Sequence, residues 1–377
     1  MLRRVLIVAG EASGDLHGSG IVRELKRRQP QVDVFGIGGD NMRREGMDLI
    51  FHVAGLAFMG FMEVVKNLST IRKVETRMQA LLDSRRPDVV VLIDYPGFNL
   101  RFARQAKRRG IPVLYYISPQ VWAWNMRRVK KMKLCVDSMK VVFPFEEEIY
   151  RKEGMDVEFV GHPLAESLRA PCPKEEFFRT HGLDIRRKVL GLFPGSRMQE
   201  IVKILPVMLA AADELRGRYD LQVAVGVAPN LGAGAIAPYL RPFHSVAVLE
   251  HATRDLMCWS DAAIVTSGTA TLETGWFGTP MAVVYKTSPV TFFIGRLLVD
   301  VPYIGLVNIV AGKKVVPEFI QHDMTRENLV QAIGMLFDDP AYARQVRREL
   351  GIIREKLGGP GASARVVDGI FALAEAA

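Results

Sequence analysis

The segment RVLIVAGEASGDLHGSGIVRELKRR (residues 4–28) joins an apolar run to a glycine-rich loop and then to a helical pattern. The run is continuous rather than alternating, which is typical of a strand covered on both faces of a parallel sheet. The loop glycines (Gly10, Gly14, Gly18 and Gly20) do not form G-x-G-x-x-G, and no lysine follows in the P-loop position. We therefore expect a strand–loop–helix unit whose ligand must be inferred from the rest of the chain.

The same unit recurs along the sequence. Apolar runs alternate with helical patterns, as RVLIVAG, DVFGIGG, DVVVLIDYP, PVLYYISP and KVVFPF in the first half and KVLGLFPGS, LQVAVG, SVAVL, AAIVTSG and PMAVVYK in the second. This alternation predicts an α/β fold with doubly wound parallel sheets. A proline-rich stretch at 161–175 interrupts it, so we expect two Rossmann-like domains, 1–168 and 169–352, facing across a cleft. A helical segment, 353–377, is able to cross back to the first domain.

Length and composition agree with two globular domains. The 377 residues exceed one ordinary core, and 49% are hydrophobic. The three cysteines are far apart and form neither a disulfide framework nor a C-x-x-C site, which favours a reducing compartment. The N-terminal apolar run is too short for a signal peptide, and no stretch approaches the ~20 uncharged residues of a membrane span. The expected location is cytoplasmic, at most attached to a membrane surface.

The net charge of +9 comes from one window. Between Asp94 and Asp137 there is no acidic residue, while ten residues are basic: Arg101, Arg104, Lys107, Arg108, Arg109, Arg127, Arg128, Lys130, Lys131 and Lys133. Two solvated helix faces would explain each residue singly. The whole block also suits an anionic partner such as nucleic acid, lipid headgroups or a phosphorylated substrate.

A first candidate phosphate site is LGLFPGSRMQEI (residues 190–201). Here a buried strand leads through Gly195, Ser196 and Arg197 into a helix. Backbone N–H groups, a hydroxyl and a guanidinium would then gather at a helix N-terminus, where phosphate is favoured. An ordinary turn with a solvated arginine is the alternative.

A second turn of the same kind lies in IVTSGTATLETGWFGTPMAVVYK (residues 264–286). Ser267, Gly268 and Thr269 offer further N–H and hydroxyl donors. Glu273 is placed to accept hydrogen bonds from a ribose diol, or serves only as an acid in the first turn of a helix. Two such turns at strand ends of one domain favour a nucleoside diphosphate over a single phosphate.

The first half carries a candidate general base. In VVVLIDYPGFN, Asp94 ends a buried strand, and Asn99 nearby is a candidate to orient it. Glu11, Asp15 and His17 lie on the opening loop, at the same sheet edge. A loop-capping role is the alternative for Asp94, and a structural role is the alternative for His17.

Two further patterns bear on ligands. The chain has no Asp-x-Asp pair and no histidine spacing typical of metal ligands, so we expect no metal, with arginine and helix N-termini neutralising the diphosphate. In LAFMGFMEVVKNL (residues 56–68), apolar side chains recur at helical spacing. They form either a core-facing stripe or a contact for acyl chains or membrane: Phe58, Met59, Phe61, Met62 and Val65.

Several motifs together carry a family resemblance. AGEASGD, MG before a helix, DYPGFN, SPQVWAW, PFEEEIY, GHPL, LFPGSR, SGTATLE and PEFIQ occur in this order. Over essentially its full length the chain resembles the bacterial lipid-A-disaccharide synthases. The resemblance implies a GT-B glycosyltransferase fold, with the acceptor in the N-terminal domain and the donor nucleotide in the C-terminal one. It implies no cofactor.

The resemblance also implies the reaction and its partners. The enzyme would move 2,3-diacylglucosamine from UDP-2,3-diacylglucosamine to the 6-hydroxyl of 2,3-diacylglucosamine 1-phosphate (lipid X), with inversion to a β-1,6 link and release of UDP. It implies peripheral attachment to the inner face of the bacterial inner membrane, an anionic surface. Family roles carry over to Asp94 as an essential acid and to Arg197 as the cation at the donor phosphates, with Asn308 and Gln321 completing the donor site.

With this resemblance, the remaining residues also receive predicted roles. The loop containing Gly10, Ser13 and Gly14 lines the acceptor side, the basic residues 127–133 meet an anionic partner, and the apolar stripe meets acyl chains. Some family members carry a second acid where Gly97 stands, so Asp94 is the only acid of its motif, and the base stays open among Asp94, Glu11 and His17. Two rivals remain: a UDP-sugar epimerase of the same fold, and a basic lipid- or nucleic-acid-binding protein. Nucleic acid is disfavoured because aromatic residues do not interleave with the basic ones.

Overall fold

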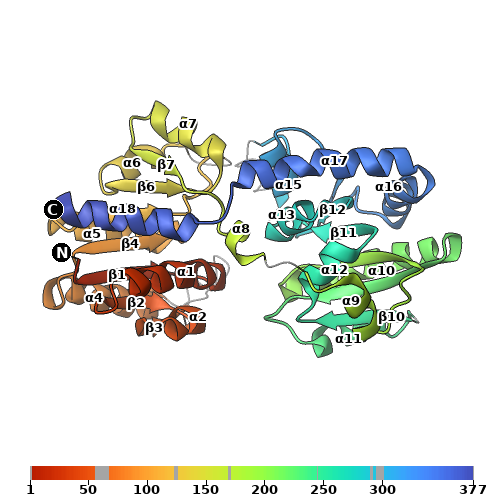
Figure 1. The fold of residues 1–377 in the computed structure, drawn as a ribbon, viewed down its shortest axis with the longest axis horizontal. Coiled ribbons are helices and arrows are strands. Elements are labelled where there is room, and N and C mark those ends of the chain that lie inside the picture. Colours follow the sequence, from red (N-terminus) through yellow and green to blue (C-terminus); the bar gives the residue numbers. More distant parts are fainter. Residues whose placement is uncertain are drawn as a thin grey trace. The chain divides into compact units, whose positions relative to one another are not determined.

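The computed structural model describes residues 2–55, 68–122, 126–168, 171–243, 245–288, 292–293 and 301–376, with the backbone alone described at 68–71. The chain forms two compact units (Figure 1). The first comprises Met1–Glu166 together with Leu357–Ala377, and the second comprises Ser167–Lys356. Each unit is built on one parallel sheet, so the prediction of a doubly wound α/β fold is confirmed.

The first unit contains a seven-stranded sheet in the order β3-β2-β1-β4-β5-β6-β7. Its central strands are wholly buried because helices cover both faces, which explains their continuous apolar sequences. The strands are β1 Arg4–Ala9, β2 Asp33–Gly38, β3 Asp48–His52, β4 Val89–Ile93, β5 Val113–Tyr116, β6 Ser138–Val141 and β7 Val157–Phe159. Strand order reverses between β1 and β4, and such a reversal opens a crevice at the carboxyl ends of the strands.

The helices of the first unit follow its strands in turn. They are α1 Ala12–Arg28, α2 Asp40–Arg44, the 3₁₀ turn η1 Val53–Gly55, α4 Leu68–Ser84, α5 Pro96–Arg108, α6 Arg128–Lys133, α7 Pro144–Lys152 and α18 Ala362–Ala376, with α8 Leu164–Ser167 at the boundary. KVVFPF is only partly strand, because β6 ends at Val141 and Pro144 begins α7 at the N1 position that proline favours.

The second unit contains a six-stranded sheet in the order β10-β9-β8-β11-β12-β13. Its order reverses between β8 and β11. The strands are β8 Lys188–Phe193, β9 Leu221–Val227, β10 Val246–Glu250, β11 Ala262–Thr266, β12 Met281–Tyr285 and β13 Glu318–Ile320. The helices are α9 Lys174–Thr180, α10 Met198–Arg218, α11 Ala233–Leu240, α12 Thr253–Trp259, α13 Thr269–Trp276, α15 Leu306–Ala311, α16 Arg326–Asp338 and α17 Pro340–Leu357.

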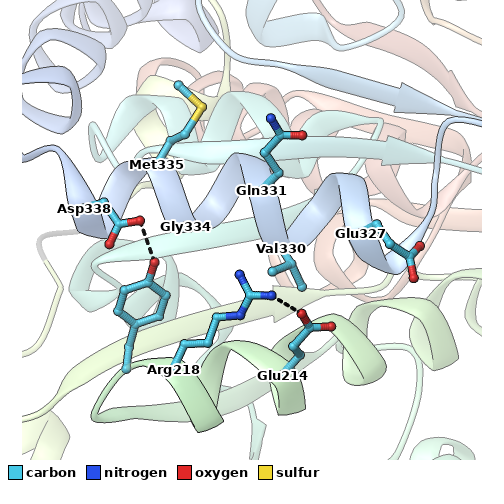
Figure 2. A pocket seen from close by; sticks show the side chains of 9 residues that line it. Glu214, Arg218, Glu327, Val330, Gln331, Gly334, Met335 and Asp338 are labelled. Atoms are coloured by element: carbon cyan, nitrogen blue, oxygen red, sulfur yellow. Dashed lines mark hydrogen bonds and ion pairs between the residues drawn. The ribbon is translucent and has the colours of Figure 1, made fainter.

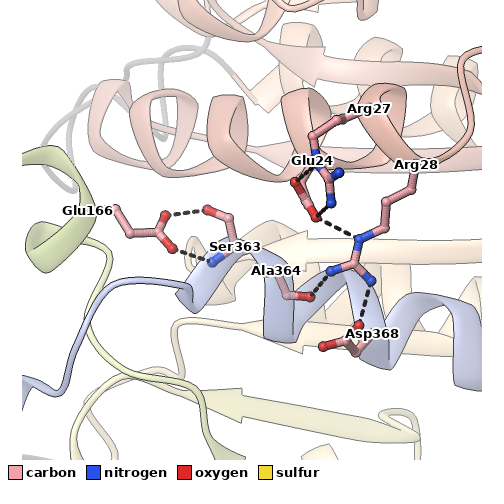
Figure 3. A network of polar contacts seen from close by, with 7 residues as sticks. All are labelled: Glu24, Arg27, Arg28, Glu166, Ser363, Ala364 and Asp368. Carbon is pink, nitrogen blue, oxygen red and sulfur yellow. Dashed lines mark hydrogen bonds and ion pairs between the residues drawn. The ribbon is translucent and has the colours of Figure 1, made fainter.

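Helix α18 ends the chain but packs in the first unit, against α1 (Figure 3). Arg28 of α1 pairs with Glu24 at 2.6 Å and with Asp368 of α18 at 2.5 Å. Glu166 accepts hydrogen bonds from the Gly361 and Ser363 backbones at 2.9 Å and from the Ser363 hydroxyl at 2.6 Å. The predicted terminal segment 353–377 is two helices, because residues 353–357 belong to α17 and a Gly-Gly-Pro-Gly break precedes α18.

Candidate active site

A cavity of about 350 Å³ opens in the second unit at the carboxyl ends of β8 and β11. This is the point where strand order reverses, at which α/β sheets bind their ligands. The register brings Phe193 beside Val265, so the turns after both strands reach the same edge. Seven of the residues predicted for the donor line this cavity: Gly195, Ser196, Arg197, Ser267, Gly268, Thr269 and Glu273.

The first wall is the turn from β8 into α10. Gly195 has φ 106°, a left-handed conformation that glycine adopts without strain, and Arg197 is the N-cap of α10. Glu200 accepts a hydrogen bond from the Ser196 backbone at 3.2 Å and pairs with Arg197 at 3.0 Å. The Arg197 side chain is 56% exposed. The turn therefore presents a cation and backbone donors to an anion at the start of a 21-residue helix.

The second wall is the turn from β11 into α13. Gly268, with φ 147°, is the N-cap of α13, and Ser267 donates its hydroxyl to the Ile304 carbonyl at 2.7 Å. Burial raises the pKa of Glu273, although Arg254 pairs with it at 3.0 Å. A largely desolvated carboxylate lining the cavity is a suitable acceptor for hydroxyl groups.

Two residues predicted for the donor site are not among those that line this cavity. Asn308 is fully buried. Its amide oxygen accepts hydrogen bonds from the backbone N–H groups of Val315, at 2.8 Å, and Val316. Its amide nitrogen donates to the Val316 carbonyl and to the Glu318 carboxylate. Gln321 is also buried and accepts from Thr287 N at 2.7 Å. Their amides therefore hold the loops that follow β12 and precede β13.

The sequence interpretation missed several lining residues. Asn230 follows β9 and donates to the Ser196 carbonyl at 2.8 Å, while Thr253 and Met257 come from α12. The Thr266 hydroxyl is buried without a partner among the residues that the structure describes. Asn230 lies in the stretch APNLGAG that follows β9, and only the adjacency of β9 to β8 shows that this stretch reaches the same edge.

A second cavity in this unit, of about 380 Å³, contains none of the predicted residues (Figure 2). It lies between the end of α10 and α16, where Tyr219 donates to Asp338 at 2.8 Å and Arg218 pairs with Glu214. Tyr219 precedes β9, so this cavity is at the amino-terminal edge of the sheet. That edge is opposite the one at which such folds bind ligands.

In the first unit, two carboxylates lie at the switch point between β1 and β4. Ala9 is in register with Ile93, which brings Glu11 and Asp94 to one edge. Half-burial, and then the negative charge of Glu11, raise the pKa of Asp94 to about 6. Asp94 is thus the only acid of its motif but not of its site, because Glu11 supplies the second carboxylate from the opening loop.

The backbone at Asp94 is unusual. Asp94 and Tyr95 both lie in the left-handed region, with φ 46° and 47°, and Tyr95 is the N-cap of α5. Asn99 donates its amide to the Asp94 carbonyl at 2.7 Å, and Tyr115 donates its hydroxyl to the same oxygen at 2.5 Å. The predicted orienting residue therefore acts on the main chain, with a tyrosine that the sequence interpretation did not single out.

The prediction of an acceptor-side loop is wrong in its extent, because α1 begins at Ala12 and only Gly10 and Glu11 precede it; the predicted residues divide into internal and accessible ones. Asp15 is buried and accepts from the backbones of Gly39 at 2.6 Å and Met42 at 3.1 Å, so its carboxylate holds the start of α2. Gly14 packs on Ala9 and Ile93, and the Tyr95 ring lies directly over Gly10. Ser13 is exposed.

His17 lies edge-on to His162, with ring centroids 6.3 Å apart. His162 is almost fully buried, and burial followed by the charge of His17 lowers its pKa to about 3. His162 therefore remains neutral throughout the physiological pH range.

The basic window separates into two parts. Lys107, Arg109 and Arg101 pair with Asp137, Asp83 and Glu75, so these cations are neutralised within the fold. The predicted anionic-partner patch lies on α6 and the residue before it, and four of its members are exposed, with Arg128 half-buried: Arg127, Arg128, Lys130, Lys131 and Lys133. Leu134, next to the patch, is 78% exposed. The predicted apolar stripe (Phe58, Met59, Phe61, Met62 and Val65) lies outside the described residues.

Within the described ranges, no helix has the length and apolar character needed to cross a membrane. Among those same residues, no group of three or more histidine, cysteine, aspartate or glutamate side chains is placed to hold a metal ion.

The two parallel sheets, each with one reversal of strand order, define a protein of the GT-B fold class. Solved structures with this fold include a UDP-GlcNAc 2-epimerase from Neisseria meningitidis bound to UDP-GlcNAc (TM-score 0.68, 15% identity, 98% of this chain and 100% of that one). They also include the glycotransferase of kitacinnamycin (TM-score 0.66, 15% identity, 99% of each chain). At these identities the likeness concerns the GT-B fold alone.

Sequence relatives define the family. The lipid-A-disaccharide synthetase family matches residues 5–355. The lipid-A-disaccharide synthase of Geobacter sulfurreducens is 47% identical over 365 residues, covering 96% of this chain and 95% of the relative. That of Coxiella burnetii is 37% identical, covering 97% and 96%. The chain belongs to the lipid-A-disaccharide synthetase family and is a glycosyltransferase.

Proposed function

We propose that this enzyme transfers 2,3-diacylglucosamine from UDP-2,3-diacylglucosamine to the 6-hydroxyl of 2,3-diacylglucosamine 1-phosphate. The product is the β-1,6-linked disaccharide 1-phosphate, and UDP leaves. The single observation that carries the proposal is the convergence of two phosphate-type turns on one cavity of the second unit. Membership of the lipid-A-disaccharide synthetase family supports the choice of sugar and acceptor.

In the proposed donor site, the diphosphate lies at the N-terminus of α10. Arg197 and the backbone N–H group of Thr269 neutralise it, replacing a metal ion. Glu273 accepts hydrogen bonds from the ribose hydroxyls. As the glycosidic bond breaks, negative charge grows on the departing phosphate, so the same donors stabilise the transition state more than the ground state.

In the proposed acceptor site, Asp94 is the general base. Its carboxylate takes the proton of the acceptor 6-hydroxyl, the oxygen forms a bond to the anomeric carbon, and the bond from that carbon to the UDP oxygen breaks with its electron pair. A single displacement of this kind inverts the anomeric centre. The pKa of Asp94, about 6, lets it be ionised at neutral pH while remaining more basic than an ordinary aspartate.

UDP release tests the reaction. We would measure it in detergent micelles containing UDP-2,3-diacylglucosamine, with and without 2,3-diacylglucosamine 1-phosphate. Acceptor-dependent release that is lost in Asp94→Ala is the expected result. Acceptor-dependent release that survives in Asp94→Ala would move the base to Glu11 or His17. An active preparation without acceptor-dependent release would overturn the reaction and favour an epimerase.

UDP affinity tests the donor site. Arg197→Ala should weaken UDP binding, measured by calorimetry, because it removes the cation facing the diphosphate. Arg218→Ala is the matched control, since Arg218 lies on the same helix and pairs with a glutamate in the same way. Equal UDP affinity in both variants would show that the nucleotide is misplaced.

The patch formed by residues 127–133 is the proposed contact with the inner face of the bacterial inner membrane. Exposed cations beside an exposed leucine suit an anionic lipid surface, because electrostatic attraction and apolar insertion act together. The double variant Lys130→Glu/Lys131→Glu should lose binding to vesicles containing anionic lipid, measured by sedimentation. Lys313→Glu/Lys314→Glu, which changes two exposed lysines of the second unit, should retain it.

A further inference from the structure

The turn that carries the proposed base has a backbone that seldom persists without support. Asp94 and Tyr95 are consecutive non-glycine residues with positive φ. Such residues lie in a sparsely populated region and persist where the surrounding structure holds them, often at functional sites. The question is which groups hold this turn.

Two buried donors converge on one oxygen of the turn. The Tyr115 hydroxyl lies 2.5 Å from the Asp94 carbonyl oxygen, and the Asn99 amide nitrogen lies 2.7 Å from it. Both side chains are fully buried. Tyr115 belongs to β5, whose register places it opposite Leu92 of β4, so its position is set by the sheet rather than by the turn. Asn99, in contrast, lies on the helix that the turn begins.

We infer that Tyr115 is a positioning residue for catalysis: its hydroxyl anchors the Asp94 carbonyl to the sheet and so holds the Asp94 carboxylate beside Glu11. The inference rests on the proposed function, in which that carboxylate accepts the acceptor proton. Tyr115 does not touch the substrate in this role. It fixes the backbone from which the base projects, and a displacement of a catalytic group by about 1 Å can slow a reaction strongly.

The neighbouring tyrosine provides a matched control. Tyr116 lies on the same strand and is fully buried, but its hydroxyl has no hydrogen-bond partner among the described residues. Tyr115→Phe and Tyr116→Phe therefore remove the same atom from adjacent buried positions. Only the first removes a bond to the turn.

The experiment compares the steady-state kinetics of wild type, Tyr115→Phe and Tyr116→Phe by acceptor-dependent UDP release. Tyr115→Phe should lower kcat roughly threefold to tenfold, the range of one lost hydrogen bond, while UDP affinity stays unchanged. Tyr116→Phe should match wild type. If Tyr115→Phe folds poorly, Asn99→Ala takes its place in the comparison. It removes the other donor to the Asp94 carbonyl and should also lower kcat.

The pH profile separates positioning from a general structural effect. The Glu11 carboxylate raises the pKa of Asp94 and the backbone N–H of Tyr95 lowers it, while the charge of Asp94 in turn raises the pKa of the Tyr115 hydroxyl. In Tyr115→Phe the relaxed turn exposes Asp94 to water, which lowers its pKa. The acidic limb of the kcat profile should therefore move below pH 6. Loss of folded enzyme would instead lower kcat at every pH without moving the limb. Equal kcat and equal profiles for both tyrosine variants would overturn the inference. A wild type without acceptor-dependent release would instead overturn the proposed function.

Discussion

Replacing Gly10 by alanine places a side chain in space that the Tyr95 ring already fills. A Cβ at this position would lie 2.8 Å from the Tyr95 Cβ and closer still to two ring atoms. Ordinary carbon contacts are about 3.5–4.0 Å, so Tyr95 would have to move by about 1 Å or more. Because the overlap reaches its Cβ, rotation of the ring alone does not relieve it. Overpacking of this kind costs about 1–3 kcal/mol of unfolding free energy.

Gly97→Ala is the matched control on the same turn. Gly97 lies in the first turn of α5, and a Cβ there would meet no atom within 4 Å. Alanine in a helix is more stable than glycine by about 0.5–1 kcal/mol. The two variants should therefore differ by about 3 kcal/mol at the middle of these ranges, or roughly 6–12 °C in the melting temperature of a unit of this size.

Calorimetry on both variants, together with acceptor-dependent UDP release, is the assay. Gly10→Ala should also lose activity, because Tyr95 follows the proposed base directly. Adding Tyr95→Ala should recover part of the lost stability, since the double variant removes the ring that the new methyl meets. If Gly10→Ala is as stable and as active as Gly97→Ala, the packing of Tyr95 over Gly10 is not what constrains the turn.

Three other predictions follow from the same structure. The Asp94 pKa is raised by burial and by the charge of Glu11, so activity should fall as pH drops through about 6. Glu11→Gln should move this acidic limb of the kcat/KM profile to lower pH. A limb that does not move would show that the Glu11 charge does not act on Asp94. Glu166→Gln weakens three hydrogen bonds to residues 361–363. It should therefore lower the free energy of unfolding of the first unit, measured in urea, by about 2–3 kcal/mol. The control Glu175→Gln, at an exposed position, should leave that free energy unchanged. Arg254→Gln should weaken UDP binding, because Arg254 holds Glu273 at 3.0 Å; unchanged calorimetry would show that Glu273 does not meet the ribose.

Much of the fold was predictable because buried parallel strands have continuous apolar sequences. Val89–Ile93 and Ala262–Thr266 are wholly buried, and their unbroken apolar sequences indicated strands without any knowledge of their partners. Of the four edge strands, SVAVL indicated β10, whereas β3, β7 and β13 were missed for a physical reason. β7 and β13 have three residues each and are only partly buried, so neither length nor apolar pattern distinguishes them from loops.

The candidate site was predictable where a single turn contains all its chemistry. Arg197 and Ser267 could be proposed from motifs because the strand, the turn and the helix start are contiguous in sequence. The effect of the Glu11 charge on Asp94 depends on β1 and β4 being neighbours in the sheet, and the hydrogen bond from Tyr115 depends on the register of β5. Asn308 is predicted for the donor site, and its hydrogen bonds to the backbone of Val315 and Val316 could not be predicted because they depend on the loop around it.

The return of α18 to the first unit has a consequence for synthesis on the ribosome. Ser167–Lys356 is, in chain order, an insertion within the first unit, and the helix that covers α1 is translated after the whole of the second unit. The second unit can therefore fold while the first still lacks a helix, since domains form as their residues emerge. Until residues 362–376 leave the exit tunnel, the face of α1 that includes Gly20 and meets Ser363 is uncovered. A chain stalled or truncated before this point should be a preferred substrate for chaperones and proteases, even with every candidate site residue already made.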